Sequence, residues 1–168
     1  VAKSTITGRW THLALVLGSG KLQLYADGVK EGETACPVLT ADPAEAMQIG
    51  ADDGSRVGSY TDAMPFNGLV DEIAIYPKAL DGQTIAQLAD KSHQVDRRAL
   101  QPVLYFGFAG GKANDLSGNG NSGQLQGPKP AKGLFDTALQ FKGVPGRGYW
   151  VIRTWTQDLP FLVRAMVL

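Results

Sequence analysis

Apolar and polar side chains alternate along residues 21–26, KLQLYA, where Leu22, Leu24 and Ala26 fall on one face. This period of two is typical of a half-buried β-strand. Asp27-Gly28 follows at once, and this dipeptide adopts positive φ at little cost, so it indicates a tight hairpin turn. Residues 10–17, WTHLALVL, and 29–33 are the expected neighbouring strands.

A second alternating stretch is residues 68–76, GLVDEIAIY, which predicts a strand with Asp71 on the same face as Ile73 and Ile75. Asp71 is therefore expected to point inward. A buried carboxylate needs either a cation or hydrogen-bond donors from the protein. Both interpretations stay open: a calcium ligand, or an aspartate that accepts backbone N–H groups from a nearby loop.

Further short strands are expected near residues 46–50, 103–108, 123–126, 138–141, 149–155 and 161–168. Asp81 is a candidate N-cap for one short helix over residues 82–90. The polar stretch 91–102 is typical of a linker, and Arg97, Arg98, Lys129 and Lys132 are expected to be surface charges. Many short strands with one short helix predict an all-β, antiparallel β-sandwich.

Charge and composition exclude some classes of protein. The 168 residues carry 16 basic and 16 acidic side chains, so the net charge of zero gives no reason to expect a nucleic-acid partner. No apolar run reaches the length of a membrane span. Cys36 is the only cysteine, which excludes a disulfide framework.

Residues 114–123, NDLSGNGNSG, contain a single apolar residue and many oxygen-bearing side chains. Asn114, Asp115 and Asn119 are candidate calcium ligands together with Asp71, because calcium takes six to eight oxygen ligands in flexible geometry. The alternative is a turn that braces itself through hydrogen bonds from Asp and Asn side chains to its own backbone. A structural calcium ion is thus the only cofactor that the sequence suggests.

No catalytic group is recognisable. Glycoside hydrolysis needs two carboxylates about 5–10 Å apart across a sugar, and the adjacent Asp71 and Glu72 are expected on opposite faces of their strand. His12 lies in a strand, where packing is its expected role. The sequence therefore predicts a protein that is not an enzyme.

Several motifs together resemble a known family. Three features are similar to the second half of a bacterial laminin-G-like, concanavalin A-like jelly roll. They are the strand from Trp10 to His12, the LYADG hairpin, and Phe66–Gly68 followed by Asp71–Glu72. Two later stretches look like the first half of the same domain, namely VLYFGFAGGKANDLSGNGNSG and KGLFDTALQF. The resemblance implies a jelly-roll β-sandwich.

The two halves stand in reverse order here. Residues 1–90 correspond to the C-terminal half, residues 91–102 to the linker, and residues 103–168 to the N-terminal half. Either the chain carries parts of two successive domains, or the halves pair with each other as one permuted sandwich. The chain is expected to be a segment of a larger extracytoplasmic protein that is secreted, periplasmic or on the cell surface.

The resemblance implies a non-catalytic module that binds a glycan or a protein surface. Aromatic rings stack on sugars, and Trp10, Tyr25, Tyr60, Tyr105, Trp150 and Trp155 are the aromatic candidates. The loop over residues 51–65 is the expected ligand-binding rim, through Tyr60, Asp52, Asp53 and Arg56. Two alternatives are a structural spacer that contacts neighbouring domains, and an ancillary module of a glycan-active enzyme.

Overall fold

The computed structural model describes residues 8–36, 47, 49–50, 66–92 and 95–142, and the backbone of residues 162–167. Within them the chain forms eight strands, one α-helix and two 3₁₀ turns. In chain order these are β1 (Thr11–Gly18), β2 (Lys21–Ala26), β3 (Val29–Ala35), β4 (Asn67–Tyr76), α1 (Gly82–Ala89), η1 (Arg97–Leu100), β5 (Leu104–Phe106), η2 (Ala109–Gly111), β6 (Lys129–Lys132), β7 (Thr137–Lys142) and β8 (Leu162–Val167).

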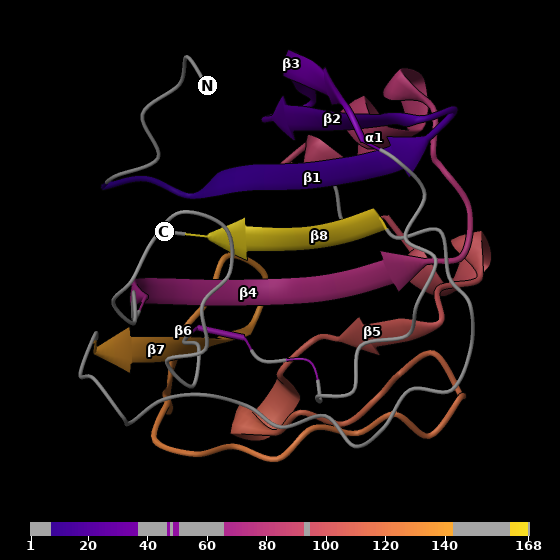
Figure 1. The fold of residues 1–168 in the computed structure, drawn as a ribbon. Helices are drawn as coiled ribbons and strands as arrows, with labels where there is room; N and C mark the ends of the chain where they lie inside the picture. The colour runs from indigo at the N-terminus through magenta and orange to yellow at the C-terminus, as the bar shows by residue number, and fades with distance from the viewer. Residues whose placement is uncertain are drawn as a thin grey trace.

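The strands form one antiparallel sheet in the order β3-β2-β1-β8-β4-β7-β6, and β5 pairs with β4 beside this path (Figure 1). This order places β8, from the second half of the chain, between β1 and β4, which belong to the first half. β4 also pairs with β7 and β5. Strands of residues 1–90 are therefore paired with strands of residues 103–168, and the division of the chain into domains stays a prediction.

The β2–β3 hairpin shows how local sequence sets the fold. Asp27 and Gly28 both have positive φ, 46° and 81°, which matches the right-handed twist of the two strands. The Asp27 carboxylate accepts a hydrogen bond from the His12 backbone N–H at 2.9 Å and pairs with Arg9 and Lys91. Burial opposes ionisation, but these three partners outweigh it and lower the pKa of Asp27 to about 2.

β4 changes partner half-way along its length. Its first residues pair with β7, and residues 73–75 pair with β5. Between them Glu72 has a φ of 50° and the register with β8 shifts, so the strand contains a β-bulge. The regular alternation predicted for residues 68–76 is therefore wrong at this point, and Val70 shares a buried cluster with Ile73 and Ile75.

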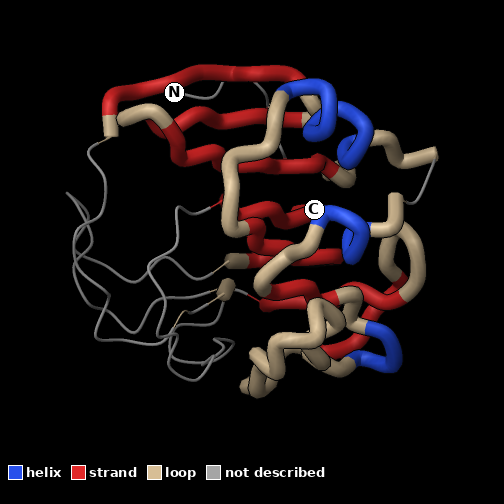
Figure 2. The backbone as a smooth tube through the Cα atoms, turned by 90° about the vertical axis from the view of Figure 1, so that its right-hand side faces the viewer, coloured by secondary structure: helices blue, strands red, loops and turns tan. Residues whose placement is uncertain are grey.

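The two faces of β4 contribute to two hydrophobic clusters. One cluster contains Ile73 and Ile75 with Leu104, Phe106 and side chains of β7. The other contains Ala74 and Tyr76 with side chains of β1, β2 and α1. Figure 2 shows the helical segments on one side of the stacked strands. Asp81 caps α1, as predicted. The helix packs on the second cluster because Ile85 and Leu88 point into it.

A buried ion pair lies at the bulge. Glu72 and Arg97 are 2% and 1% exposed, and Arg97 Nη2 lies 2.5 Å from Glu72 Oε2. The Tyr105 hydroxyl donates to Glu72 Oε1 at 3.0 Å, and Arg97 Nη1 donates to the Val95 carbonyl at 2.9 Å. The Arg97 guanidinium also lies over the Phe135 ring, 5.7 Å from its centroid.

Arg97 corrects the sequence-based prediction for residues 91–102. Arg97 is not a surface charge, because η1 turns it inward to neutralise Glu72. Its neighbour Arg98 is exposed, as expected. Lys129 and Lys132 are exposed, as expected, and lie on edge strand β6. Pro130 is tolerated there because an edge strand leaves one side unpaired.

We expect Arg97→Met to lower the free energy of unfolding by about 3 kcal/mol, because it leaves the buried Glu72 carboxylate without its cation. Chemical denaturation with urea measures this change. Arg98→Met is the matched control and is expected to have little effect, since the Arg98 side chain is 69% exposed. Equal effects of the two substitutions would contradict this role of Arg97.

Candidate functional site

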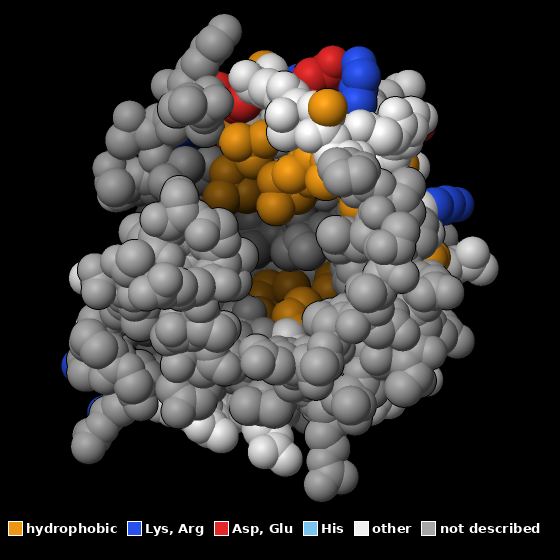
Figure 3. Space-filling model, in the orientation of Figure 1, with side chains coloured by type: hydrophobic (Ala, Val, Ile, Leu, Met, Phe, Trp, Pro, Cys, Tyr) orange, Lys and Arg blue, Asp and Glu red, His pale blue; other side chains and the backbone are white. Residues whose placement is uncertain are grey.

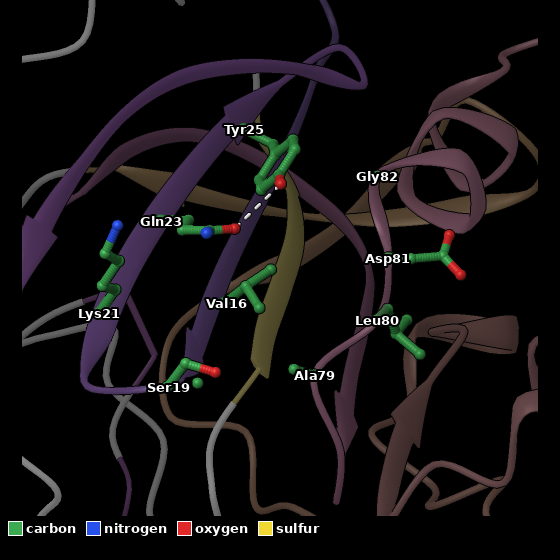
Figure 4. A pocket seen from close by; sticks show the side chains of 10 residues that line it. Val16, Ser19, Lys21, Gln23, Tyr25, Ala79, Leu80, Asp81 and Gly82 are labelled. Atoms are coloured by element: carbon green, nitrogen blue, oxygen red, sulfur yellow. Dashed lines mark hydrogen bonds between the residues drawn. The ribbon is translucent and has the colours of Figure 1, made fainter.

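A groove of about 390 Å³ lies between the β1–β2 hairpin and the segment that leads from β4 into α1 (Figure 4). One wall is formed by Val16, Gly18, Ser19, Lys21, Gln23 and Tyr25, and the other by residues 79–82. This volume falls at the small end of the range for sites that take small molecules.

The groove follows from the register of the hairpin. Lys21, Gln23 and Tyr25 alternate along β2 and so project from the same face. Their partners on β1 are smaller: Gly18 lies opposite Lys21, and Val16 lies opposite Gln23. Across the groove, a Cβ atom at Gly18 would come within 3.3 Å of the Ala79 Cβ, so small residues keep this space open.

The polar groups of the groove are arranged by hydrogen bonds. The Tyr25 hydroxyl donates to Gln23 Oε1 at 3.0 Å, as Figure 4 shows. Lys21 Nζ lies 2.7 Å from Glu33 Oε1 on β3, and Lys30 pairs with the same carboxylate. Figure 3 shows acidic and basic side chains together at the β3 edge, above hydrophobic side chains.

Asp81 is the only acidic residue among the groove-lining residues that the structure describes. Its side chain points away from Gln23 and Tyr25, and Oδ1 accepts the Thr84 backbone N–H at 2.7 Å (Figure 4). Hydrogen bonds from Thr84 lower the pKa of Asp81, so it is an ionised helix cap. Among the described lining residues, no second carboxylate lies beside it for acid–base catalysis.

Asp71 is buried, as predicted, with 1% of its surface exposed. Its Oδ2 atom accepts the Leu134 N–H at 2.8 Å and the Phe135 N–H at 3.5 Å. A Cβ atom at Gly133 would lie 2.5 Å from this oxygen, so a glycine lets the turn approach. Burial, together with the Glu72 charge, raises the pKa of Asp71 against the effect of these N–H donors.

Residues 114–123 are held by a brace centred on Asp115. Its Oδ1 accepts the N–H groups of Tyr105 and Ser117 at 3.1 and 2.9 Å, and its Oδ2 accepts the Asn121 N–H at 2.9 Å and the Ser117 hydroxyl at 2.8 Å. Asn119 and Asn121 donate their side-chain amides to the Val103 carbonyl at 3.2 and 3.0 Å. The loop is thereby fastened to the start of β5.

These contacts bear on the predicted calcium ligands. N–H and O–H donors point at both oxygens of Asp115, and Asp71 accepts from a different segment of the chain. Asn114 is exposed. In the part of the chain that the structure describes, no three His, Cys, Asp or Glu side chains are grouped so as to hold a metal ion. The arrangement favours the self-braced turn, and the calcium site stays a prediction.

The other predicted ligand-binding residues, Asp52, Asp53, Arg56 and Tyr60, lie outside the described residues. The groove at β2 was not predicted as a site, although Tyr25 was among the candidate aromatics. The sequence signal was the run Lys21, Gln23 and Tyr25 on the polar side of an alternating strand. Recognising the groove also required the pairing with Gly18 and the position of Ala79, which only the structure provides.

The sequence profile of the concanavalin A-like lectin/glucanases superfamily, in its laminin G-like form, matches residues 2–86. The chain belongs to this family, and its fold is a concanavalin A-like β-sandwich, as the sequence resemblance predicted. Searches of curated proteins and of solved structures found no match. Among the described residues, no helix is long and apolar enough to cross a membrane.

We expect Asp115→Ala to lower the free energy of unfolding by about 2 kcal/mol, because several partly buried donors lose their acceptor. Asn114→Ala is the matched control in the same loop and is expected to be nearly neutral. Thermal unfolding in calcium and in EDTA provides the measurement. A calcium-dependent rise in the midpoint that both substitutions abolish would establish the metal site in place of the brace.

Proposed function

We propose that this chain is a non-catalytic carbohydrate-binding module of an extracytoplasmic protein, and that its glycan ligand lies in the groove between β2 and residues 79–82. The observation that carries this proposal is the concave surface itself, which combines an amide, a hydroxyl, an ammonium group and an apolar floor. A few placed polar groups on a largely preformed concave surface are typical of small-molecule sites. The family, with its lectins and glucanases, makes a glycan the expected ligand.

The lining indicates how a sugar would be held. Tyr25 is 8% exposed, so its ring has no open face for stacking, and its hydroxyl donates to Gln23. Gln23 and Ser19 have the hydrogen-bonding groups that sugar hydroxyls require. Val16 and Leu80 provide apolar surface for the C–H groups of a sugar ring. Recognition would thus depend mainly on hydrogen bonds and shape.

The acidic residues support binding without turnover. Glycoside hydrolysis uses two carboxylates on either side of the scissile bond. Among the described groove residues Asp81 is the only acid, and it caps α1. Asp71 and Glu72 are buried, where they accept hydrogen bonds or pair with Arg97.

A glycan array followed by titration calorimetry tests the proposal. Ala79→Leu is expected to abolish binding, because Ala79 is an exposed wall residue and a larger side chain fills the groove. Gln23→Ala is expected to weaken binding about three- to tenfold, the value of one hydrogen bond. The purified chain is expected to leave the bound glycan intact.

Gln140→Ala is the matched control for Gln23→Ala, because Gln140 is an exposed glutamine on β7, several strands away. It is expected to bind as tightly as the unsubstituted chain. Binding that survives Ala79→Leu would place the ligand elsewhere. No binding to any glycan would favour the structural-spacer alternative, and hydrolysis would favour an enzyme.

A further inference from the structure

The polar groups of the groove are unequal in their hydrogen-bonding roles. Its strongest acceptors are already used within the protein, since Gln23 Oε1 accepts from the Tyr25 hydroxyl and the Asp81 carboxylate accepts from Thr84. The donors of the lining are the Gln23 side-chain NH₂ and the Lys21 ammonium group, which is shared with Glu33. A ligand rich in acceptors fits this lining better than one rich in donors.

The charged side chains of the described lining are Lys21 and Asp81, one basic and one acidic. Lys21 lines the groove and is shared with Glu33, which also pairs with Lys30. The two lysines lower the pKa of Glu33 to about 2, so this group of three charges keeps a net charge of +1 at neutral pH. Exposed pairs of this kind are weak, so the Lys21 ammonium group can bind a second anion at little cost.

Asp81 does not cancel this preference. Its carboxylate is turned toward the first turn of α1 and away from Gln23 and Tyr25 (Figure 4). Hydrogen bonds from Thr84 and Gln83 lower the pKa of Asp81 and hold its ionised carboxylate at the start of the helix. Of the two charged side chains of the described lining, Lys21 is the one that lies on the β2 wall beside Gln23.

We infer that the groove selects an acidic sugar, one whose ring carries a carboxylate, and that Lys21 Nζ and the Gln23 side-chain NH₂ bind that carboxylate. This inference rests on the proposed function and specifies the class of glycan. A carboxylate accepts two charge-assisted hydrogen bonds side by side, which suits two donors on alternate residues of one strand. The sugar ring would then lie against Val16 and Leu80, within reach of the Ser19 hydroxyl.

The test compares hexuronic acid trisaccharides with their methyl esters, which have the same rings without the charge. In calorimetry at low salt, the unsubstituted chain is expected to bind the acid at least about tenfold more tightly than the ester. Lys21→Met is expected to remove this difference by weakening the binding of the acid alone. Raising the salt concentration is expected to weaken the binding of the acid and to leave the binding of the ester unchanged.

A second variant is expected to improve binding, which a folding defect would not do. Glu33→Gln releases Lys21 from its partner. It is expected to raise the affinity for the acid about threefold, with no effect on the affinity for the ester. Lys132→Met, on edge strand β6 at the other end of the sheet, is the control and is expected to leave both affinities unchanged.

Equal affinities for acid and ester, both lost in Ala79→Leu, would overturn the inference and keep the proposed function. If Ala79→Leu still bound both the acid and the ester, the inference and the proposed function would both be overturned. An acidic peptide, such as a trimer of glutamate, that binds as tightly as the uronate and competes with it would also overturn the inference, since it would show that the charge alone is read.

Discussion

The buried carboxylate of Glu72 is the constraint on which much of this structure depends. It lies at the bulge where β4 exchanges β7 for β5, so it cannot reach water and must be paired inside the protein. Arg97 supplies the cation and Tyr105 the hydrogen bond, and both belong to segments that follow α1. The one interaction therefore joins the two segments of the chain, and it explains why a polar stretch such as residues 95–101 packs against the sheet.

The groove lies on the same face of the sheet as this ion pair, beside β1 and β2. α1 must cover the face that carries Ala74 and Tyr76, which brings residues 79–82 beside the β1–β2 hairpin. Capping by Asp81 starts the helix and at the same time turns the nearest carboxylate out of the groove. Small side chains at Gly18 and Ala79 then leave an open space in which β2 presents Lys21 and Gln23. Residues 79–82 thus both lead into the helix and line the groove.

Much of the fold was predictable from local pattern. The strand at residues 21–26, the Asp27-Gly28 turn and the capped helix were placed correctly because each depends on neighbours in sequence. The bulge at Glu72 and the burial of Arg97 were not predictable in this way, since an alternating stretch gives no sign of an extra residue and a buried ion pair joins positions far apart in the chain. For the same reason, candidate acids such as Asp71 and Asp115 could be identified, but their backbone partners could not. The groove was missed because it depends on which small residues face Lys21 and Gln23 across two elements.

The central claim, that a glycan occupies the groove, is tested most directly by mapping the contact surface. Backbone amide chemical shifts would be recorded for the full chain by NMR during titration with a hexuronic acid trisaccharide. The account predicts that the perturbed amides cluster at residues 16–25 and 79–82, and that those of residues 114–123 stay unchanged. Perturbations confined to other segments, or absent at saturating ligand, would contradict it.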